Sequence, residues 1–149
     1  MIRKILLITD QSESAERAAQ IAGEFAQQFE AQILVIYIQV PIPAMTHIAE
    51  ESGDTLPWSG TQAGFHGLEQ AAERILKRTA SILKTWEVPF ETRLERGHPA
   101  VRACQVALEE QSDLVVVGYQ GVKRATALHL EDVNERISEC AHCPVVVVN

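Results

Sequence analysis

The sequence is short of cysteine and has no long apolar run, and each shortage excludes a class of protein. Its three cysteines are an odd number and too few for a disulfide scaffold, so we expect a reducing cytoplasm. No apolar stretch reaches the length of a membrane span. The short run that begins at Ile5 stops at Asp10, and no signal-peptide cleavage pattern follows it. We therefore predict a cytoplasmic protein that does not contact a membrane.

Positive charge is also in short supply. The chain carries 13 Lys and Arg residues against 20 Asp and Glu residues, which gives a net charge of −7. Nucleic acids and anionic membranes need a positive face, so this balance argues against both as partners. A local group of basic residues (Arg74, Lys77, Arg78 and Lys84) follows one acid-rich helical pattern, which is typical of a solvated helix face.

The composition that is present belongs to a globular chain, with 46% hydrophobic and 22% charged residues. We predict a single domain over residues 1–149, because this length is ordinary for one domain. Strands are predicted at residues 4–9, 31–38, 89–95, 113–118 and 144–149, and helices at residues 15–29, 68–86, 98–111 and 131–141. This alternation predicts an α/β fold with a parallel sheet and helices on both faces.

Residues 40–65 interrupt the alternation. Proline, glycine, serine and acids dominate there without a helical or strand period, so we predict a long variable loop. Loops of this length within compact domains are usually functional covers or mobile segments. In an open parallel sheet, ligands bind at the carboxyl ends of the strands. That rule places any site at Asp10 and at the turn formed by residues 118–121.

Four segments together resemble the universal stress protein A family. They are KILLITDQSESAERA at residues 4–18, RGHPA at residues 96–100, SDLVVVGYQG at residues 112–121 and VNERISECAHCPVVVVN at residues 133–149. They occur in the family's order and spacing and cover almost the whole chain. The resemblance implies a Rossmann-like fold of the adenine nucleotide alpha hydrolase type. Its five-stranded parallel sheet has the order 3-2-1-4-5, with two helices on each face.

The resemblance also implies a possible ATP site, because some family members bind ATP. Their loop reads G-x-x-G, nine further residues, then Gly followed by Ser or Thr. Carried over position by position, the candidate nucleotide-binding residues are Asp10, Ile38, Val117, Gly118 and Gly121. The second half of the pattern is absent here, since Glu131 replaces the glycine and Asp132 replaces the hydroxyl residue.

Glu131 and Asp132 oppose phosphate binding. A helix N-terminus favours an anion by roughly 0.3–1 kcal/mol, or about 2 kcal/mol when partly buried. One carboxylate about 4 Å from a phosphate charge opposes binding by about 4 kcal/mol at an effective dielectric constant near 20. Asp132 has a structural use instead, as the N-cap of the last helix with Glu135 completing a capping box. We therefore predict a degenerate nucleotide-binding loop.

Two routes leave nucleotide binding open. Adenosine can bind through Asp10 and Ile38 alone, or a cation can bridge a phosphate to the acids. Asp10 itself allows two interpretations. It can contact a ligand, or it can order the turn, as an acid between a strand and a helix commonly does. The function predicted first is a non-enzymatic stress-response protein without a cofactor that acts through an unidentified protein partner. The alternative is a nucleotide-dependent switch that binds ATP or AMP.

Other reactive residues do not form a catalytic pattern. Cys140 and Cys143 form a C-x-x-C, but at a helix C-terminus, where the dipole raises the thiol pKa, so we predict a packing role. No second pair with metal-ligand spacing accompanies them. His98 is interpreted as a capping or surface group. We find no nucleophile–base pair and expect no enzymatic activity.

The C-terminal strand, from Val145 to Val148, is apolar and predicted at an edge of the sheet. The family resemblance implies a homodimer through this strand, and the sequence agrees, because no charge interrupts it. The alternative is an edge covered by the chain's own helices.

Overall fold

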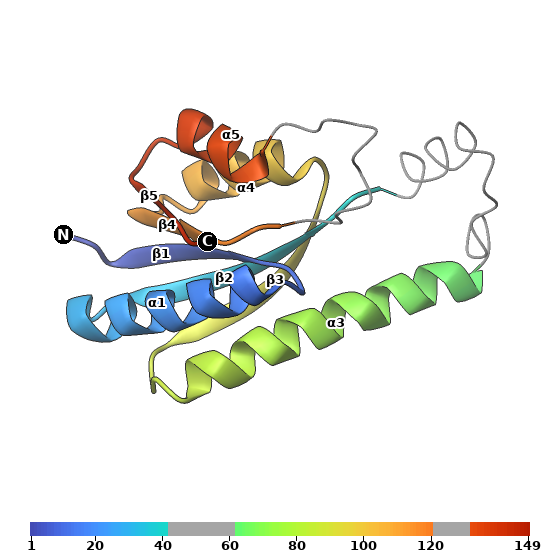
Figure 1. The fold of residues 1–149 in the computed structure, drawn as a ribbon, viewed down its shortest axis with the longest axis horizontal. Helices are drawn as coiled ribbons and strands as arrows, with labels where there is room; N and C mark the ends of the chain where they lie inside the picture. Colours follow the sequence, from blue (N-terminus) through green and yellow to red (C-terminus); the bar gives the residue numbers. More distant parts are fainter. Residues whose placement is uncertain (42–61, 121–131) are drawn as a thin grey trace.

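The protein is built on a five-stranded parallel sheet with helices on both faces (Figure 1). The computed structural model describes residues 1–41, 62–120 and 132–149. The strands are β1 (Lys4–Thr9), β2 (Gln32–Gln39), β3 (Phe90–Arg96), β4 (Leu114–Val117) and β5 (Val145–Val147). The described helices are α1 (Glu13–Phe29), α3 (Gln62–Lys84), α4 (Pro99–Glu109) and α5 (Val133–Cys140). The strand order β3-β2-β1-β4-β5 confirms the predicted topology.

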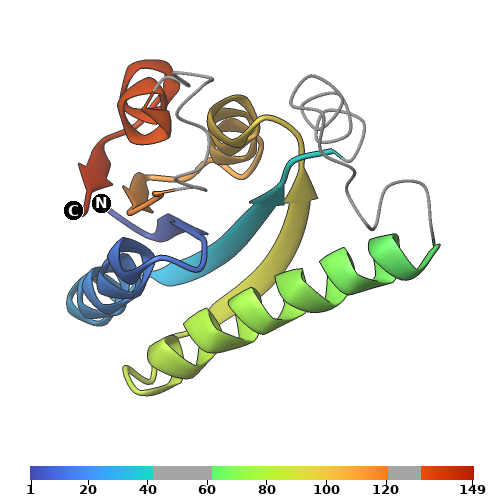
Figure 2. The same ribbon diagram turned by 45° about the vertical axis from the view of Figure 1, so that its right-hand side comes forward.

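Each face of the sheet has its own apolar core. Helices α1 and α3 cover one face, and α4 and α5 cover the other (Figure 2). Along β1, Ile5 and Leu7 pack into the α1/α3 layer, whereas Leu6 and Ile8 pack into the α4/α5 layer. Successive strand side chains point to opposite faces, so a central strand covered on both sides must be apolar throughout. This explains why residues 5–8 are a continuous aliphatic run.

Small residues bring α1 close to its neighbours. The alanines at positions 15, 18, 19, 22 and 26 are fully buried. Gly23 lies under the ring of Trp86, where an added Cβ would come 2.3 Å from Trp86 Cδ1. Ser12 caps the helix, because its side chain accepts a hydrogen bond from Ala15 N.

The predicted loop at residues 40–65 is wrong at its carboxyl end. Helix α3 begins at Gln62, three residues before the predicted end of the loop. Its early residues include Gly64 and Gly67, which weaken the helical pattern, so sequence periodicity detects the helix only from Leu68. Residues 42–61 of the predicted loop lie outside the described part of the chain.

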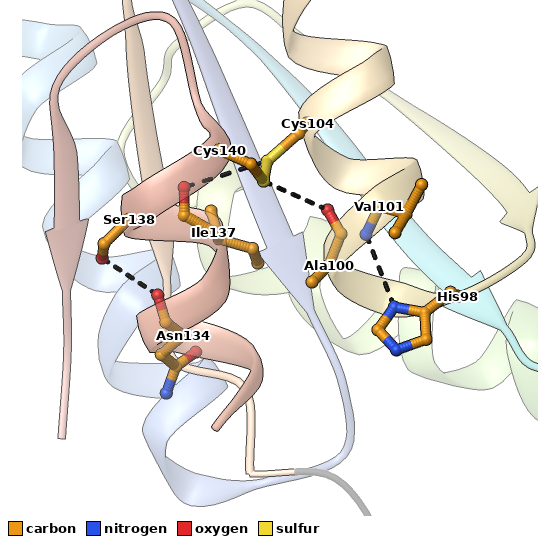
Figure 3. Close-up of a disulfide and its surroundings, with 8 residues drawn as sticks. All are labelled: His98, Ala100, Val101, Cys104, Asn134, Ile137, Ser138 and Cys140. Carbon is orange, nitrogen blue, oxygen red and sulfur yellow. Dashed lines mark hydrogen bonds between the residues drawn. A yellow bond between two sulfur atoms is a disulfide. The ribbon is translucent and has the colours of Figure 1, made fainter. Parts of the chain in front are cut away.

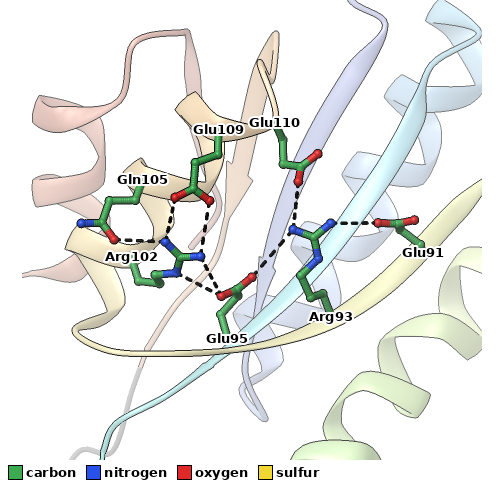
Figure 4. A network of polar contacts seen from close by, with 7 residues as sticks. All are labelled: Glu91, Arg93, Glu95, Arg102, Gln105, Glu109 and Glu110. Carbon is green, nitrogen blue, oxygen red and sulfur yellow. Dashed lines mark hydrogen bonds and ion pairs between the residues drawn. The ribbon is translucent and has the colours of Figure 1, made fainter.

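An ion-pair network joins α4 to β3 (Figure 4). Arg102 on α4 contacts Glu95 at 3.0 Å and Glu109 at 3.1 Å. Arg93 on β3 contacts Glu110 at 2.9 Å and Glu95 at 3.8 Å. The guanidinium hydrogen bonds, to Glu110 and Glu109 above all, raise the pKa values of Arg93 and Arg102. The half-buried Glu95 therefore links both arginines.

Membrane insertion has no support in the described helices. Of α1, α3, α4 and α5, none combines the length and the apolar character that a bilayer crossing requires.

Candidate functional site

Asp10 organises the carboxyl edge of the sheet. It follows β1 directly and is 9% exposed. Its Oδ1 accepts hydrogen bonds from Ser12 N at 2.8 Å and from Ser12 Oγ, and its Oδ2 accepts from Gln120 N at 2.9 Å. One carboxylate thus joins the turn before α1 to the segment after β4. The turn-ordering role is confirmed, and contact with a ligand stays a prediction.

Gln120 and Ser14 form a second link across the same edge. Gln120 Nε2 donates to Ser14 Oγ at 2.7 Å, and Arg17 also donates to that oxygen at 3.2 Å. Arg17 Nε in turn donates to the backbone oxygen of Asn149 at 2.7 Å. These hydrogen bonds therefore connect the first turns of α1 to the segment after β4 and to Asn149.

The two tyrosines of the chain lie at this edge, Tyr37 near the end of β2 and Tyr119 after β4. Burial raises the pKa of Tyr119 to about 12, and the negative charge of Asp10 adds to this shift. Burial and Asp10 also raise the pKa of Tyr37. The raised pKa values keep both phenols neutral near pH 7, and the rings pack against opposite core layers, Tyr37 on the α1/α3 side and Tyr119 on the α4/α5 side.

Gly118 has a steric role at the end of β4. An added Cβ would lie 2.3 Å from the carbonyl oxygen of Ser14, which is backbone and cannot move independently of α1. The glycine therefore lets β4 and the first turn of α1 approach one another. This close approach of β4 and α1 explains the glycine at position 118 without a phosphate ligand.

The other predicted nucleotide-binding residues lie in different environments. Ile38 is 2% exposed and packs in the α4/α5 core layer. Val117 is also fully buried there, and its carbonyl oxygen accepts a hydrogen bond from Val148 N at 2.8 Å. Gly121 and Glu131 lie outside the described residues. The structure thus brings Asp10 and Gly118 together through Ser12, whose Oγ also lies 3.2 Å from the Gly118 oxygen.

The start of α5 carries its own cap. Asp132 Oδ1 accepts a hydrogen bond from Asn134 N at 3.0 Å, so the predicted N-cap is confirmed. Glu135 adds a second carboxylate in the first turn. At α1, Glu13 and Glu16 occupy the equivalent first-turn positions. Two helix N-termini at this edge therefore hold carboxylates where an anionic ligand would otherwise be favoured.

Asn134 is a site residue that sequence reasoning missed. Its side chain accepts from Tyr119 N at 3.1 Å and donates to Tyr119 O at 2.9 Å. The sequence signal that could have identified Asn134 is an amide side chain near the start of a predicted helix, close to the end of a predicted strand. The pairing partner is 15 residues away, so spacing alone does not identify it.

The expectation for the cysteines needs a correction. Cys104 on α4 and Cys140 at the end of α5 form a disulfide (Figure 3). The packing role predicted for Cys140 is therefore wrong, and its partner is not Cys143 of the C-x-x-C. The reason is that packing of α4 against α5 brings together two cysteines separated by 36 positions. Cys143 is free and packs against the α4/α5 core layer.

The remaining polar features do not add catalytic chemistry. His98 caps α4, since its Nδ1 accepts from Val101 N at 3.5 Å, which confirms the predicted capping role. Over residues 1–41, 62–120 and 132–149, no group of three or more His, Cys, Asp or Glu side chains is arranged to hold a metal. An open groove of about 580 Å³ between α1 and α3 is lined by residues that include Glu16, Arg78 and Ile82. None of the predicted nucleotide residues lines it.

This fold and edge define a parallel α/β protein whose polar residues gather where the strands end. The family model described as the universal stress protein family matches residues 1–149, and the chain belongs to that family. A universal stress protein of Thermus aquaticus is 31% identical in an alignment that covers 99% of this chain and 99% of the relative.

Solved structures show the same fold. A universal stress protein in complex with cAMP is 21% identical, with a TM-score of 0.69 over 99% of this chain and 96% of that one. The universal stress protein from Archaeoglobus fulgidus in complex with dAMP is 18% identical, with a TM-score of 0.66 over 100% and 98% of the two chains.

Proposed function

We propose that this chain is a non-enzymatic universal stress protein that acts through protein contacts and binds ATP poorly. The observation that carries the proposal is the hydrogen bond from Asn134 N to the Asp132 carboxylate, 3.0 Å long, at the start of α5. The family pattern places a phosphate-holding hydroxyl residue at position 132. Here that position carries a negative charge and satisfies the helix end itself.

Charge at the rest of the edge supports the same proposal. Asp10, Glu13 and Glu135 add carboxylates around the end of β1 and the starts of α1 and α5, whereas Glu16 is paired with Arg78. A triphosphate brings several negative charges into this field, and the repulsion of even one close carboxylate exceeds the attraction of a helix N-terminus. Arg17 is a cation at this edge, but its guanidinium bonds to Ser14 and Asn149.

Nucleotide carried through purification tests the proposal. The purified protein is denatured, and its supernatant is separated by ion-exchange chromatography against ATP, ADP and AMP standards. We expect adenine nucleotide far below one mole per mole of protein. Stoichiometric ATP would contradict the proposal.

Titration calorimetry with magnesium and ATP tests the cause. The double variant Glu131→Gly/Asp132→Ser restores the family pattern, and serine remains a good N-cap. We expect it to bind ATP at least about tenfold more tightly than the parent, a difference of about 1.4 kcal/mol. The control Glu139→Gln removes a carboxylate from the opposite end of α5 and should not change the affinity. If the double variant binds no better than the parent, the acids are not the cause.

A second candidate is binding of a nucleoside monophosphate. The cAMP and dAMP complexes of the structural relatives favour it, because such ligands bring less charge than ATP. Asp10, held in place at the end of β1, is the residue from which an adenosine contact would start. Recovery of AMP without ATP in the extraction experiment would select this candidate over the first.

We also propose a homodimer formed through β5. This strand is at the edge of the sheet beyond β4, and Val147 is 39% exposed. The ladder to β4 uses Pro144 O and Val148 N, so the alternating residues 145 and 147 direct their backbone groups away from β4. An apolar strand with free backbone groups favours pairing with a second copy.

Analytical ultracentrifugation tests this arrangement. We expect a dimer for the parent at micromolar concentration and a monomer for Val147→Lys, because a charged edge residue blocks strand pairing. The control Leu108→Lys places the same charge at an apolar residue on α4 that is 64% exposed. It should remain a dimer. A parent that sediments only as a monomer would refute the proposal.

A further inference from the structure

The disulfide between Cys104 and Cys140 ties the carboxyl end of α5 to α4 (Figure 3). The two Cα atoms are 6.0 Å apart, which is an ordinary separation for a disulfide. Among the residues of α5, Ile137 is the buried one. At the other end of the helix, Asn134 makes its two hydrogen bonds to Tyr119. The disulfide is therefore a covalent link one turn beyond the buried Ile137, at the carboxyl end of α5.

The surroundings of the two sulfurs suit a reduced pair as well as an oxidised one. Cys104 Sγ lies 3.8 Å from the carbonyl oxygen of Ile137, and Cys140 Sγ lies 3.8 Å from that of Ala100 (Figure 3). Each contact crosses from one helix to the other. Thiols at these positions would each have a carbonyl to accept a weak S–H hydrogen bond. Neither redox state leaves an unsatisfied group between the helices.

The pair is also open to small reagents. Cys140 is an exposed residue and Cys104 is half-buried. Attack on a disulfide needs a thiolate that can reach a sulfur, and Cys140 is the more exposed of the two residues. Burial and the charge of Asp113 raise the pKa of the Cys143 thiol, which slows its exchange with the pair.

We propose that Cys104 and Cys140 form a reversible redox couple that fastens α5 to α4 when oxidised and frees its carboxyl end when reduced. The oxidant is a low-molecular-weight disulfide. The Cys140 thiolate attacks one of its sulfurs, which forms a mixed disulfide and releases one small thiol. The Cys104 thiolate then attacks Cys140 Sγ, which closes the protein disulfide and releases the second small thiol. Two electrons pass to the small disulfide, and the two released thiols take up the two cysteine protons. Two small thiols reverse the sequence.

The chemical part is tested by equilibrating the folded protein in glutathione buffers of graded composition. Free thiols are then alkylated, and the products are identified by mass spectrometry of the intact protein and its peptides. We expect a single two-electron transition that converts the Cys104–Cys140 disulfide into two thiols. Cys143→Ser should titrate like the parent, whereas Cys104→Ser should show no such transition. Failure of the pair to oxidise in the folded protein, or a Cys140–Cys143 disulfide in its place, would overturn the proposal.

The structural part is tested by hydrogen exchange on the same samples. Amides of α5 should exchange at least about tenfold faster after reduction, because local opening no longer has to occur against the cross-link. Amides of the central strand β1 provide the internal reference. In Cys104→Ser and Cys140→Ser, α5 should exchange at the fast rate with or without reductant. Equal α5 exchange in the oxidised and reduced parent would overturn the proposed control of α5. These readouts do not involve a nucleotide, so they are independent of the proposed function.

Discussion

Asn134 on α5 bonds both backbone groups of Tyr119, accepting from its N–H at 3.1 Å and donating to its carbonyl at 2.9 Å. One side chain thus replaces the pairing that a neighbouring strand would provide after β4 ends. The charge of Asp10 also contributes to the raised pKa of Tyr119, so Tyr119 lies near Asp10. The Asn134–Tyr119 contact therefore connects α5 to the polar edge of the sheet.

Replacement of Asn134 by alanine should destabilise the protein. Two partly buried backbone groups lose their partners, so we expect the free energy of unfolding to fall by about 1–3 kcal/mol. Alanine favours helix more than asparagine does, so helix propensity cannot cause the loss. Urea denaturation measures the change. Ser138→Ala, on the exposed side of the same helix, should stay within about 0.5 kcal/mol of the parent. Equal effects of the two substitutions would show that the Tyr119 contact contributes little.

Alanine at Gly118 and alanine at Gly67 should have opposite effects. At Gly118 the new methyl group collides with the backbone of Ser14, so we expect a loss of about 3 kcal/mol. At Gly67, in α3, an added Cβ meets no atom within 4 Å, and the helix gains about 0.5–1 kcal/mol. Thermal unfolding followed by circular dichroism distinguishes them. A Gly118→Ala protein as stable as the parent would contradict the steric role of this glycine.

Alkaline pH should destabilise the protein through its tyrosines. The pKa of Tyr119 is raised from 10.0 to about 12 in the folded state, so folding favours the neutral phenol. That contribution is complete below pH 10.0 and is lost as the pH rises toward 12. Because Tyr37 and Tyr119 are the only tyrosines, phenolate absorbance near 295 nm reports them alone. We expect both to ionise later than free tyrosine.

Asp10→Asn separates the two causes of this shift. Burial is the larger cause and Asp10 the next, so the variant should lower both phenol pKa values only in part. Glu24→Gln makes the same exchange of carboxylate for amide on α1, at an exposed residue, and should leave the titration unchanged. Phenols that titrate near the ordinary tyrosine pKa in the folded parent would contradict the burial of these rings.

The ion pairs that join β3 to its neighbouring helices, to α4 through Arg102 and to α3 through Arg96, should contribute unequally. Arg102 has a side chain 24% exposed and holds the half-buried Glu95, so Arg102→Ala should cost about 1–2 kcal/mol. Arg96 is 62% exposed and meets Glu69 at 3.6 Å, so Arg96→Ala should cost less than about 0.5 kcal/mol. Urea denaturation at low and high salt compares the two, and salt should reduce the parent's advantage over Arg102→Ala. A loss at Arg96 as large as that at Arg102 would contradict the importance of burial here.

Much of the fold follows from local patterns, because each local preference agrees with the tertiary structure. Residues 4–9 were predicted as a strand to the residue, since both faces of β1 are buried and demand apolar side chains. His98 and Asp132 were predicted as caps because the capping bond is local in sequence. Asp10 and Gly118 were selected because each lies at the end of a predicted strand, and their contact with a ligand stays a prediction.

What the sequence did not reveal depends on how helices pack. Asn134 reaches Tyr119 because α5 packs beside the end of β4, and Cys104 reaches Cys140 because α5 packs beside α4. The spacing of these residues along the chain does not predict either contact. The start of α3 was missed for a different reason, because Gly64 and Gly67 weaken the helical signal before Leu68.

The bond between Cys104 and Cys140 also makes a closed covalent ring that contains the whole of β4. A single peptide-bond cut inside this ring does not divide the molecule, because its two pieces remain joined through sulfur. Such a nicked protein migrates as one chain on a non-reducing gel and as two fragments after reductant is added. Gel analysis of a nicked sample therefore reports whether Cys104 was joined in the cell to a cysteine beyond the cut, provided that free thiols are blocked at lysis.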